Sequence, residues 1–275
     1  MNGLLWKVDK LFVLSQFQKD QYARHLPHAP GSLFYVTRNG VDIELVQQAE
    51  ATMENGSRRQ GVGAALCGRP FTPTSRGAAS ECAGGARPPE PVAPEKDTPA
   101  VRRGGNKPRF IYTSRPERGL EIILDMWPQI LARWPDAELL ICRYDHPEGD
   151  RRMSSFLAAL GAKMGGMKGL RFLGGLSKEQ LYREMAACDL MLYPSIFPEI
   201  SCISAIEAAA CGLPIVASKY CALKETVVDG ETGLLIAGDP RSDAYREKYI
   251  RAVQRLMGDE ELRATMSQRA RELAA

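Results

Sequence analysis

Residues 198–218, PEISCISAIEAAACGLPIVAS, combine two carboxylates with a strongly apolar run. Glu199 and Glu207 lie on either side of the start of a predicted helix, which leads directly into an apolar strand. A charge placed among apolar residues is costly unless it is paired or used. Two interpretations follow from these residues alone: a capped helix start, or a site for a phosphorylated, hydroxyl-rich ligand.

The chain around this stretch alternates short apolar strands with amphipathic helices from residue 109 onward. The predicted strands are 109–113, 137–142, 170–174, 189–194, 214–218 and 232–237. Such alternation is typical of right-handed β-α-β units and predicts an α/β fold with a Rossmann-like, doubly wound parallel sheet. Ligands bind at the carboxyl ends of the strands in this architecture, so the residues that follow each strand are candidates for a site.

Four segments are predicted along the chain. Residues 1–48 read as strand–helix–strand, too short to bury an adequate core alone, and we interpret them as the remnant of an incomplete second Rossmann-like domain. Residues 49–106 are rich in Pro and Gly towards their end and have no apolar periodicity. This composition predicts a disordered low-complexity insert or linker. Residues 107–257 form the doubly wound domain, and residues 258–275 a truncated C-terminal helix.

The composition and the missing motifs exclude several classes of protein. A net charge of +3 is too small to indicate nucleic acid or a membrane surface, and no apolar run reaches the roughly 18 residues of a membrane span. The seven cysteines, without CxxC spacing, favour reduced thiols in a cytoplasmic protein. The absence of GxGxxG and GxxxxGK[ST] argues against a dinucleotide oxidoreductase and a P-loop NTPase. No Asp-x-Asp pair is present to hold a divalent metal.

Two strand ends carry further candidate residues. The first strand of the domain is followed by a turn with Arg115 and Arg118, beside a helix that starts at Gly119. Guanidinium groups and the N–H groups of a helix start suit a diphosphate, and a solvated basic turn is the alternative. After the third strand, Gly174 and Leu176 mark a place where backbone can approach a flat base.

The paired glutamates, with the AAACGLPIVAS and DGETGLLI segments that follow, resemble the C-terminal domain of family 4 retaining glycosyltransferases, which have the GT-B architecture. The turn SRPERGLE, residues 114–121, resembles the phosphate-binding turn of that family. The segments VDKLFVLSQFQKDQY and YVTRNGVD resemble the end of its first domain and the crossover between domains. The resemblance covers residues 8–42 and 109–257. It implies an acceptor-domain remnant in residues 1–48 and a nucleotide-sugar-binding domain in residues 107–257.

The resemblance implies a role for each matching side chain. Glu199 would bind hydroxyl groups of the donor sugar, and Glu207 would bind the ribose of the nucleotide, since a carboxylate can accept two hydroxyl hydrogen bonds. Arg115 and Arg118 would hold the diphosphate and stabilise it as the leaving group. Together with Glu199, these arginines are the predicted catalytic residues.

Backbone groups complete the implied site. The N–H groups of Cys202 and Ile203, at the helix N-terminus, would assist the arginines, and Gly174 and Leu176 would contact the base. The sequence departs from the family pattern at Cys202, where the family has glycine.

The implied function is glycosyl transfer, of the hexosyltransferase type and with retention. The donor would be a nucleoside-diphosphate sugar, the acceptor a saccharide, lipid or small molecule, and no metal or other cofactor would be needed. No nucleic acid or integral membrane segment is expected, and peripheral membrane contact stays open. Because most of the first domain is missing, we expect impaired activity. The alternative is a non-catalytic nucleotide-sugar-binding or interaction protein, or a gene fragment.

Overall fold

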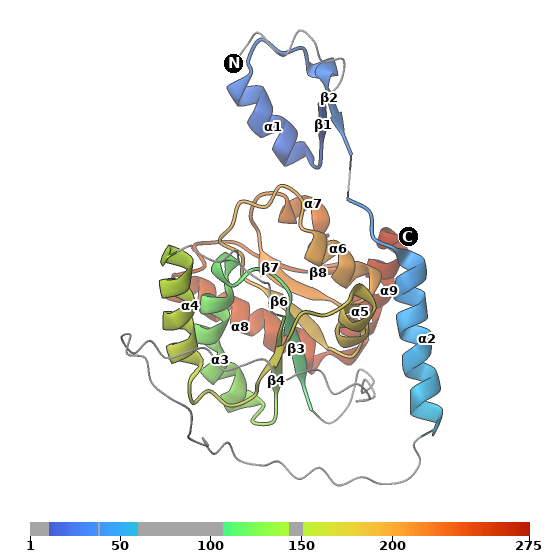
Figure 1. The fold of residues 1–275 in the computed structure, drawn as a ribbon, viewed down its shortest axis with the longest axis vertical. Coiled ribbons are helices and arrows are strands. Elements are labelled where there is room, and N and C mark those ends of the chain that lie inside the picture. The colour runs from blue at the N-terminus through green and yellow to red at the C-terminus, as the bar shows by residue number, and fades with distance from the viewer. Residues whose placement is uncertain (1–10, 38, 60–106, 143–150) are drawn as a thin grey trace, which may run out of the picture.

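The computed structural model describes residues 11–37, 39–59, 107–142 and 151–275, which form a six-stranded parallel sheet covered by helices and a small two-stranded unit beside it (Figure 1). The strands of the large sheet are β3 (Arg109–Tyr112), β4 (Glu138–Cys142), β5 (Leu170–Leu173), β6 (Leu190–Tyr193), β7 (Ile215–Ser218) and β8 (Gly233–Ile236). The helices that follow them are α3 (Leu120–Arg133), α4 (Arg151–Met164), α5 (Lys178–Ala186), α6 (Ile203–Ala210), α7 (Leu223–Thr226), α8 (Asp243–Gly258) and α9 (Glu260–Ala274).

The strand order of the large sheet is β5-β4-β3-β6-β7-β8, with every neighbouring pair parallel. The chain therefore builds the sheet outward from β3 in one direction and then outward from β6 in the other. This order confirms the predicted α/β, doubly wound fold. The reversal between β3 and β6 creates a crevice at their carboxyl ends, which is where such sheets bind ligands.

Burial on both faces explains why the strands are continuous apolar runs. All four residues of β6 are fully buried, as are the three apolar residues Phe110, Ile111 and Tyr112 of β3. Helices α3, α4 and α8 lie on one side of the sheet, and α5 and α6 lie on the other (Figure 1). Helix α5 starts with a capping box, in which the side chains of Ser177 and Gln180 each accept from the other's backbone N–H.

The small unit consists of β1 (Leu11–Val13), α1 (Gln16–His25), the 3-10 turn η2 (Gly31–Leu33) and β2 (Phe34–Val36). Its two strands are parallel, and its strand–helix–strand order matches the prediction, although both strands are only three residues long. The unit lies above α7 (Figure 1). There the Glu225 carboxylate accepts from the backbone N–H groups of Gln16 at 2.9 Å and Phe17 at 2.7 Å, at the start of α1.

The predicted start of the linker at residue 49 is wrong, because helix α2 (Ile43–Arg59) continues through it. This helix packs along α5, with Val46 2% exposed and Ala49 fully buried. Three-residue spacing places Ile43, Val46 and Ala49 on one helix face, so the apolar period was a usable signal for this helix. The rest of the predicted linker, residues 60–106, lies outside the described residues.

Five cysteines fall within the described part of the chain, and all of them are buried. Cys67 and Cys82 lie outside it. In the same described ranges, no helix has the length and apolar character needed to cross a membrane. The C-terminal segment 258–275 is helical over α9, as predicted.

Candidate functional site

The turn after β3 and the loop after β6 meet at the point where the strand order reverses. Gly119 makes this approach possible: its φ is +146°, and a Cβ at this position would lie 2.4 Å from the Pro194 carbonyl oxygen. The backbone N–H of Ile196 donates to the Arg118 carbonyl at 3.0 Å, which joins the two segments. The predicted phosphate-binding turn and the predicted glutamate loop therefore form one continuous surface.

Glu199 is the centre of a buried polar network in this crevice. Its residue exposure is 3%, and Arg118 Nη1 donates to both carboxylate oxygens, at 2.9 Å and 3.1 Å. Tyr193 Oη also donates to Oε1, and Ser114 Oγ lies 3.1 Å from the same phenol. The Arg118 guanidinium lies 4.1 Å from the centre of the Phe197 ring, a cation–π contact. Glu199 and Arg118 are thus held as a pair.

The electrostatics of this network shift the pKa values of Tyr193, Arg118 and Cys202. Burial raises the pKa of the Tyr193 phenol, and Cys202 and Glu199 raise it further, so the phenol donates. Burial by itself would lower the pKa of Arg118, but Glu199 and Tyr193 raise it and the net shift is upward. Burial also raises the pKa of the Cys202 thiol to about 12, so this thiol stays neutral at physiological pH.

Arg115 differs from Arg118 in its surroundings. Its side chain is 53% exposed, and its nearest carboxylate is Glu117 at 3.8 Å. The position of its backbone is nevertheless fixed, because Tyr112 Oη donates to the Arg115 carbonyl at 2.6 Å. Arg115 is therefore the arginine of the turn that presents its charge to solvent, whereas Arg118 is committed to Glu199.

Glu207 lies on α6, one turn inside the helix, and has a residue exposure of 3%. Two side chains of α5 contact its Oε1 atom: Lys178 Nζ, and Tyr182 Oη at 3.4 Å. Burial raises the pKa of the Tyr182 phenol, and the Glu207 carboxylate raises it further, so Tyr182 is a donor to the carboxylate. The second glutamate therefore has its own set of partners, separate from those of Glu199.

The N-terminus of α6 points to the same edge of the sheet. Cys202 is the N-cap residue, and its side chain makes no capping hydrogen bond. Ser204 Oγ donates to the Thr113 carbonyl at 3.0 Å, which fixes the first turn of α6 against the end of β3. The first N–H groups of a helix have no carbonyl partner within it, and the predicted contact of those near Cys202 and Ile203 with a diphosphate stays a prediction.

Gly174 and Leu176 follow the outer strand β5, at the same edge of the sheet. Gly174 is buried and Leu176 is half-buried against the core. The loop that contains them ends at Ser177, so the next residue, Lys178, reaches Glu207. The structure therefore connects this loop to the second glutamate, and a base contact stays a prediction.

Sequence reasoning missed Tyr193, Phe197, Lys178 and Tyr182. Tyr193 is the last residue of β6, so its place at a strand end was a usable signal. Lys178 and Tyr182 are four residues apart on α5 and so share a helix face, but nothing in the sequence showed that this face meets α6.

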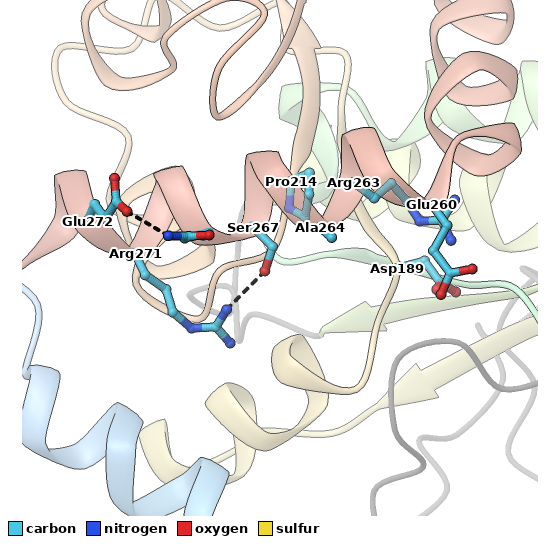
Figure 2. A pocket seen from close by; sticks show the side chains of 9 residues that line it. Asp189, Pro214, Glu260, Arg263, Ala264, Ser267, Arg271 and Glu272 are labelled. Atoms are coloured by element: carbon cyan, nitrogen blue, oxygen red, sulfur yellow. Dashed lines mark hydrogen bonds between the residues drawn. The ribbon is translucent and has the colours of Figure 1, made fainter.

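A pocket of 560 Å³ opens at the opposite edge of the sheet, beside α9 (Figure 2). Asp189 and Pro214, which precede β6 and β7, place it at the amino ends of the strands. Its two arginines are already engaged: Arg263 donates to two backbone carbonyls, and Arg271 contacts Glu50 at 2.7 Å. The charges around it are mixed, with carboxylates of Asp189, Glu260 and Glu272 beside the two arginines.

Comparisons of the sequence with known proteins all find glycosyltransferases. A family model described as "Glycosyl transferases group 1" matches residues 95–273. The chain is 29% identical over 153 residues to the phosphatidyl-myo-inositol mannosyltransferase of Mycobacterium tuberculosis, which covers 50% of this chain. It is 30% identical over 166 residues to the D-inositol 3-phosphate glycosyltransferase of Corynebacterium efficiens, which covers 60% of this chain. Each match spans 38% of the relative, so the chain corresponds to well under half the length of these proteins.

Solved structures show the same fold. The structure of Anabaena HepE in complex with UDP and glucose aligns with a TM-score of 0.63 at 18% identity. The alignment covers 97% of this chain and 58% of HepE. WaaG, a glycosyltransferase involved in lipopolysaccharide biosynthesis, has a TM-score of 0.60 at 18% identity, covering 96% of this chain and 58% of WaaG. At this level of identity the two structures establish the architecture.

Proposed function

Since the chain belongs to the group 1 glycosyl transferases, as its sequence predicted, we propose that its six-stranded domain binds a nucleoside-diphosphate sugar and presents it for transfer to an acceptor. The UDP and glucose held by HepE support a nucleotide sugar as donor. The two curated relatives are named for inositol-containing compounds, which favours a hydroxyl-rich acceptor among the predicted saccharides, lipids and small molecules.

One observation carries the proposal: two buried carboxylates and an exposed arginine lie at the carboxyl edge of the sheet, where the strand order reverses. Glu199 and Glu207 are both 3% exposed, yet each is paired with a cation at the carboxyl edge of the sheet. Arg115 supplies an additional exposed positive charge at the same edge. The hydroxyl groups of a sugar and a ribose need hydrogen-bond acceptors, and the diphosphate between them needs a cation.

We assign the roles as follows. Glu199 accepts from hydroxyl groups of the sugar, and Glu207 accepts from the ribose. When the bond between the anomeric carbon and the diphosphate oxygen breaks, negative charge grows on the diphosphate. Arg115 and the N–H groups at the start of α6 stabilise that charge. The hydrogen bonds between Arg118 and Glu199 use only Nη1, so we propose that Arg118 turns its other N–H groups to the diphosphate.

Retention at the anomeric carbon and independence from metal ions are part of the same proposal. The arginines and the helix N-terminus supply the positive charge that a metal ion would otherwise supply. The buried free thiols support a cytoplasmic location, where cysteines stay reduced.

Replacing Glu207 by alanine is expected to weaken UDP binding by about 1–3 kcal/mol, because a hydrogen bond between a charged group and the ribose is lost. Isothermal calorimetry on the whole chain with UDP, GDP and ADP measures the affinity before and after the change. Glu138→Ala is the control, because Glu138 pairs with Lys107 at the amino edge of the sheet. Unchanged affinity in Glu207→Ala would remove the ribose role. No binding of any of these nucleotides by the unchanged chain would contradict the proposed function.

Replacing Arg115 by alanine is expected to weaken UDP binding more than UMP binding, because the exposed guanidinium is assigned to the diphosphate. Stability should hardly change, since the side chain makes no buried contact. Calorimetry with the two nucleotides gives the ratio directly, and Arg133→Ala, an exposed arginine in the last turn of α3, is the matched control. Equal losses for UDP and UMP would place Arg115 away from the terminal phosphate.

A further inference from the structure

Helix α5 contributes two donors to one oxygen of Glu207. Lys178 Nζ and Tyr182 Oη both contact Oε1. Within the described residues, the hydrogen bonds recorded for this carboxylate all use Oε1, and Oε2 takes part in none of them. The carboxylate is therefore turned so that one oxygen faces α5 and the other is left for a ligand.

Lys178 occupies a position that helix stability does not favour. It is the first residue of α5, where the helix dipole favours acidic side chains and disfavours a cation. The capping box at Ser177 and Gln180 already stabilises this helix start without it. The local structure gives no reason for a lysine at this position, whereas the contact with Glu207 does.

The charge balance also depends on Lys178. Glu207 has a side-chain exposure of 4%, and a buried carboxylate without a counter-charge is costly. Lys178 is the cation paired with it among the residues that the structure describes, and its own side chain is 57% exposed. The lysine can therefore neutralise Glu207 from the rim of the crevice while its ammonium stays hydrated.

We propose that Lys178 is a positioning residue for ribose recognition, which fixes and neutralises Glu207 so that Oε2 faces the ribose hydroxyl groups. The inference rests on the proposed function, because it assigns the ribose to Glu207. Tyr182 assists by donating to the same Oε1 atom from the next turn of α5. Without the ammonium, the carboxylate is free to rotate, and its preference for a ligand with two neighbouring hydroxyl groups declines.

The test compares UDP with 2′,3′-dideoxy-UDP, which keeps the base and both phosphates but lacks the ribose hydroxyl groups. The unchanged chain is expected to bind UDP more tightly, and Lys178→Met is expected to reduce this preference about 10-fold. Affinity for the dideoxy nucleotide should stay the same, because this nucleotide offers no ribose hydroxyl groups to Glu207 and methionine keeps most of the apolar stem of lysine. Lys178→Arg, which restores a cation, should recover most of the preference for UDP.

Lys107→Met is the matched control, because Lys107 is 49% exposed and pairs with Glu138 at the opposite edge of the sheet. A thermal melt of each variant shows whether it is folded at the temperature of the binding measurement, so that affinities are compared between folded chains. Equal losses of both nucleotides in Lys178→Met would mean that the lysine contacts phosphate, and an unchanged preference would mean that it has no part in recognition. Either result overturns this inference while leaving nucleotide binding by the unchanged chain intact. Failure of the unchanged chain to bind UDP, GDP and ADP would overturn the proposed function and this inference with it.

Discussion

Glu199→Ala is expected to lower the free energy of unfolding by about 2–4 kcal/mol, one of the largest effects of a single change in this domain. The change removes the acceptor shared by Arg118 and Tyr193. The Tyr193 side chain is fully buried and then loses its carboxylate acceptor, while Ser114 Oγ stays 3.1 Å from its phenol oxygen. The loss is less than for a fully buried ion pair, because 26% of the Arg118 side chain reaches solvent. Urea unfolding followed by circular dichroism measures it.

The matched variant Glu199→Gln separates stability from binding. Glutamine keeps the shape of the side chain and one carbonyl acceptor, so its cost in stability should be clearly smaller than that of alanine. Because the amide accepts from fewer sugar hydroxyl groups, Glu199→Gln should still reduce the affinity for UDP-glucose relative to UDP. If UDP and UDP-glucose lose affinity equally in this variant, Glu199 does not contact the sugar.

Gly119→Ala is expected to lower the free energy of unfolding by a similar amount, about 2–4 kcal/mol. A Cβ there would lie 2.4 Å from the Pro194 carbonyl oxygen and 3.0 Å from its carbon, both backbone atoms that cannot move aside cheaply. The φ of +146° adds strain for any residue with a side chain. Relief of this clash would separate the arginine turn from the Glu199 loop, so affinity for UDP should fall as well.

Gly166→Ala is the control for the backbone strain. Its φ is +89°, and nothing lies within 4 Å of the added Cβ, so the variant carries strain without a clash. We expect it to cost about 1 kcal/mol and to leave nucleotide affinity unchanged. If the two glycine variants lose the same stability, the close approach to Pro194 contributes little to the fold.

Most of the large domain follows from the sequence. Its strands are short apolar runs, and its helices carry apolar residues at helical spacing, so both periods are visible without the structure. The β-α-β rule then converts the order of elements into a parallel sheet. The exception is α2, where Val46 and Ala49 are buried and Ile43 packs partly buried against the core. These apolar residues recur at helical spacing, but the Pro- and Gly-rich segment that follows led the predicted linker to begin at residue 49.

The sequence predicted which residues lie at the candidate site, but it did not predict which side chains contact one another there. Arg115, Arg118, Glu199 and Glu207 all lie at the predicted edge of the sheet, because parallel strands bring their carboxyl ends together. The two arginines nevertheless have different surroundings, one exposed and one paired with Glu199. Side chains three residues apart in this turn face different directions, and the sequence does not show which of the two points inward.

The sequence by itself determined the family, the doubly wound sheet and the pair of glutamates, since each depends on spacing along one stretch of chain. The tertiary structure alone decided which partners hold each carboxylate. Lys178 lies 29 residues before Glu207, and Arg118 lies 81 residues before Glu199. Contacts over such separations exist only once the sheet has placed α5 beside α6 and the β3 turn beside the β6 loop, so no local pattern encodes them.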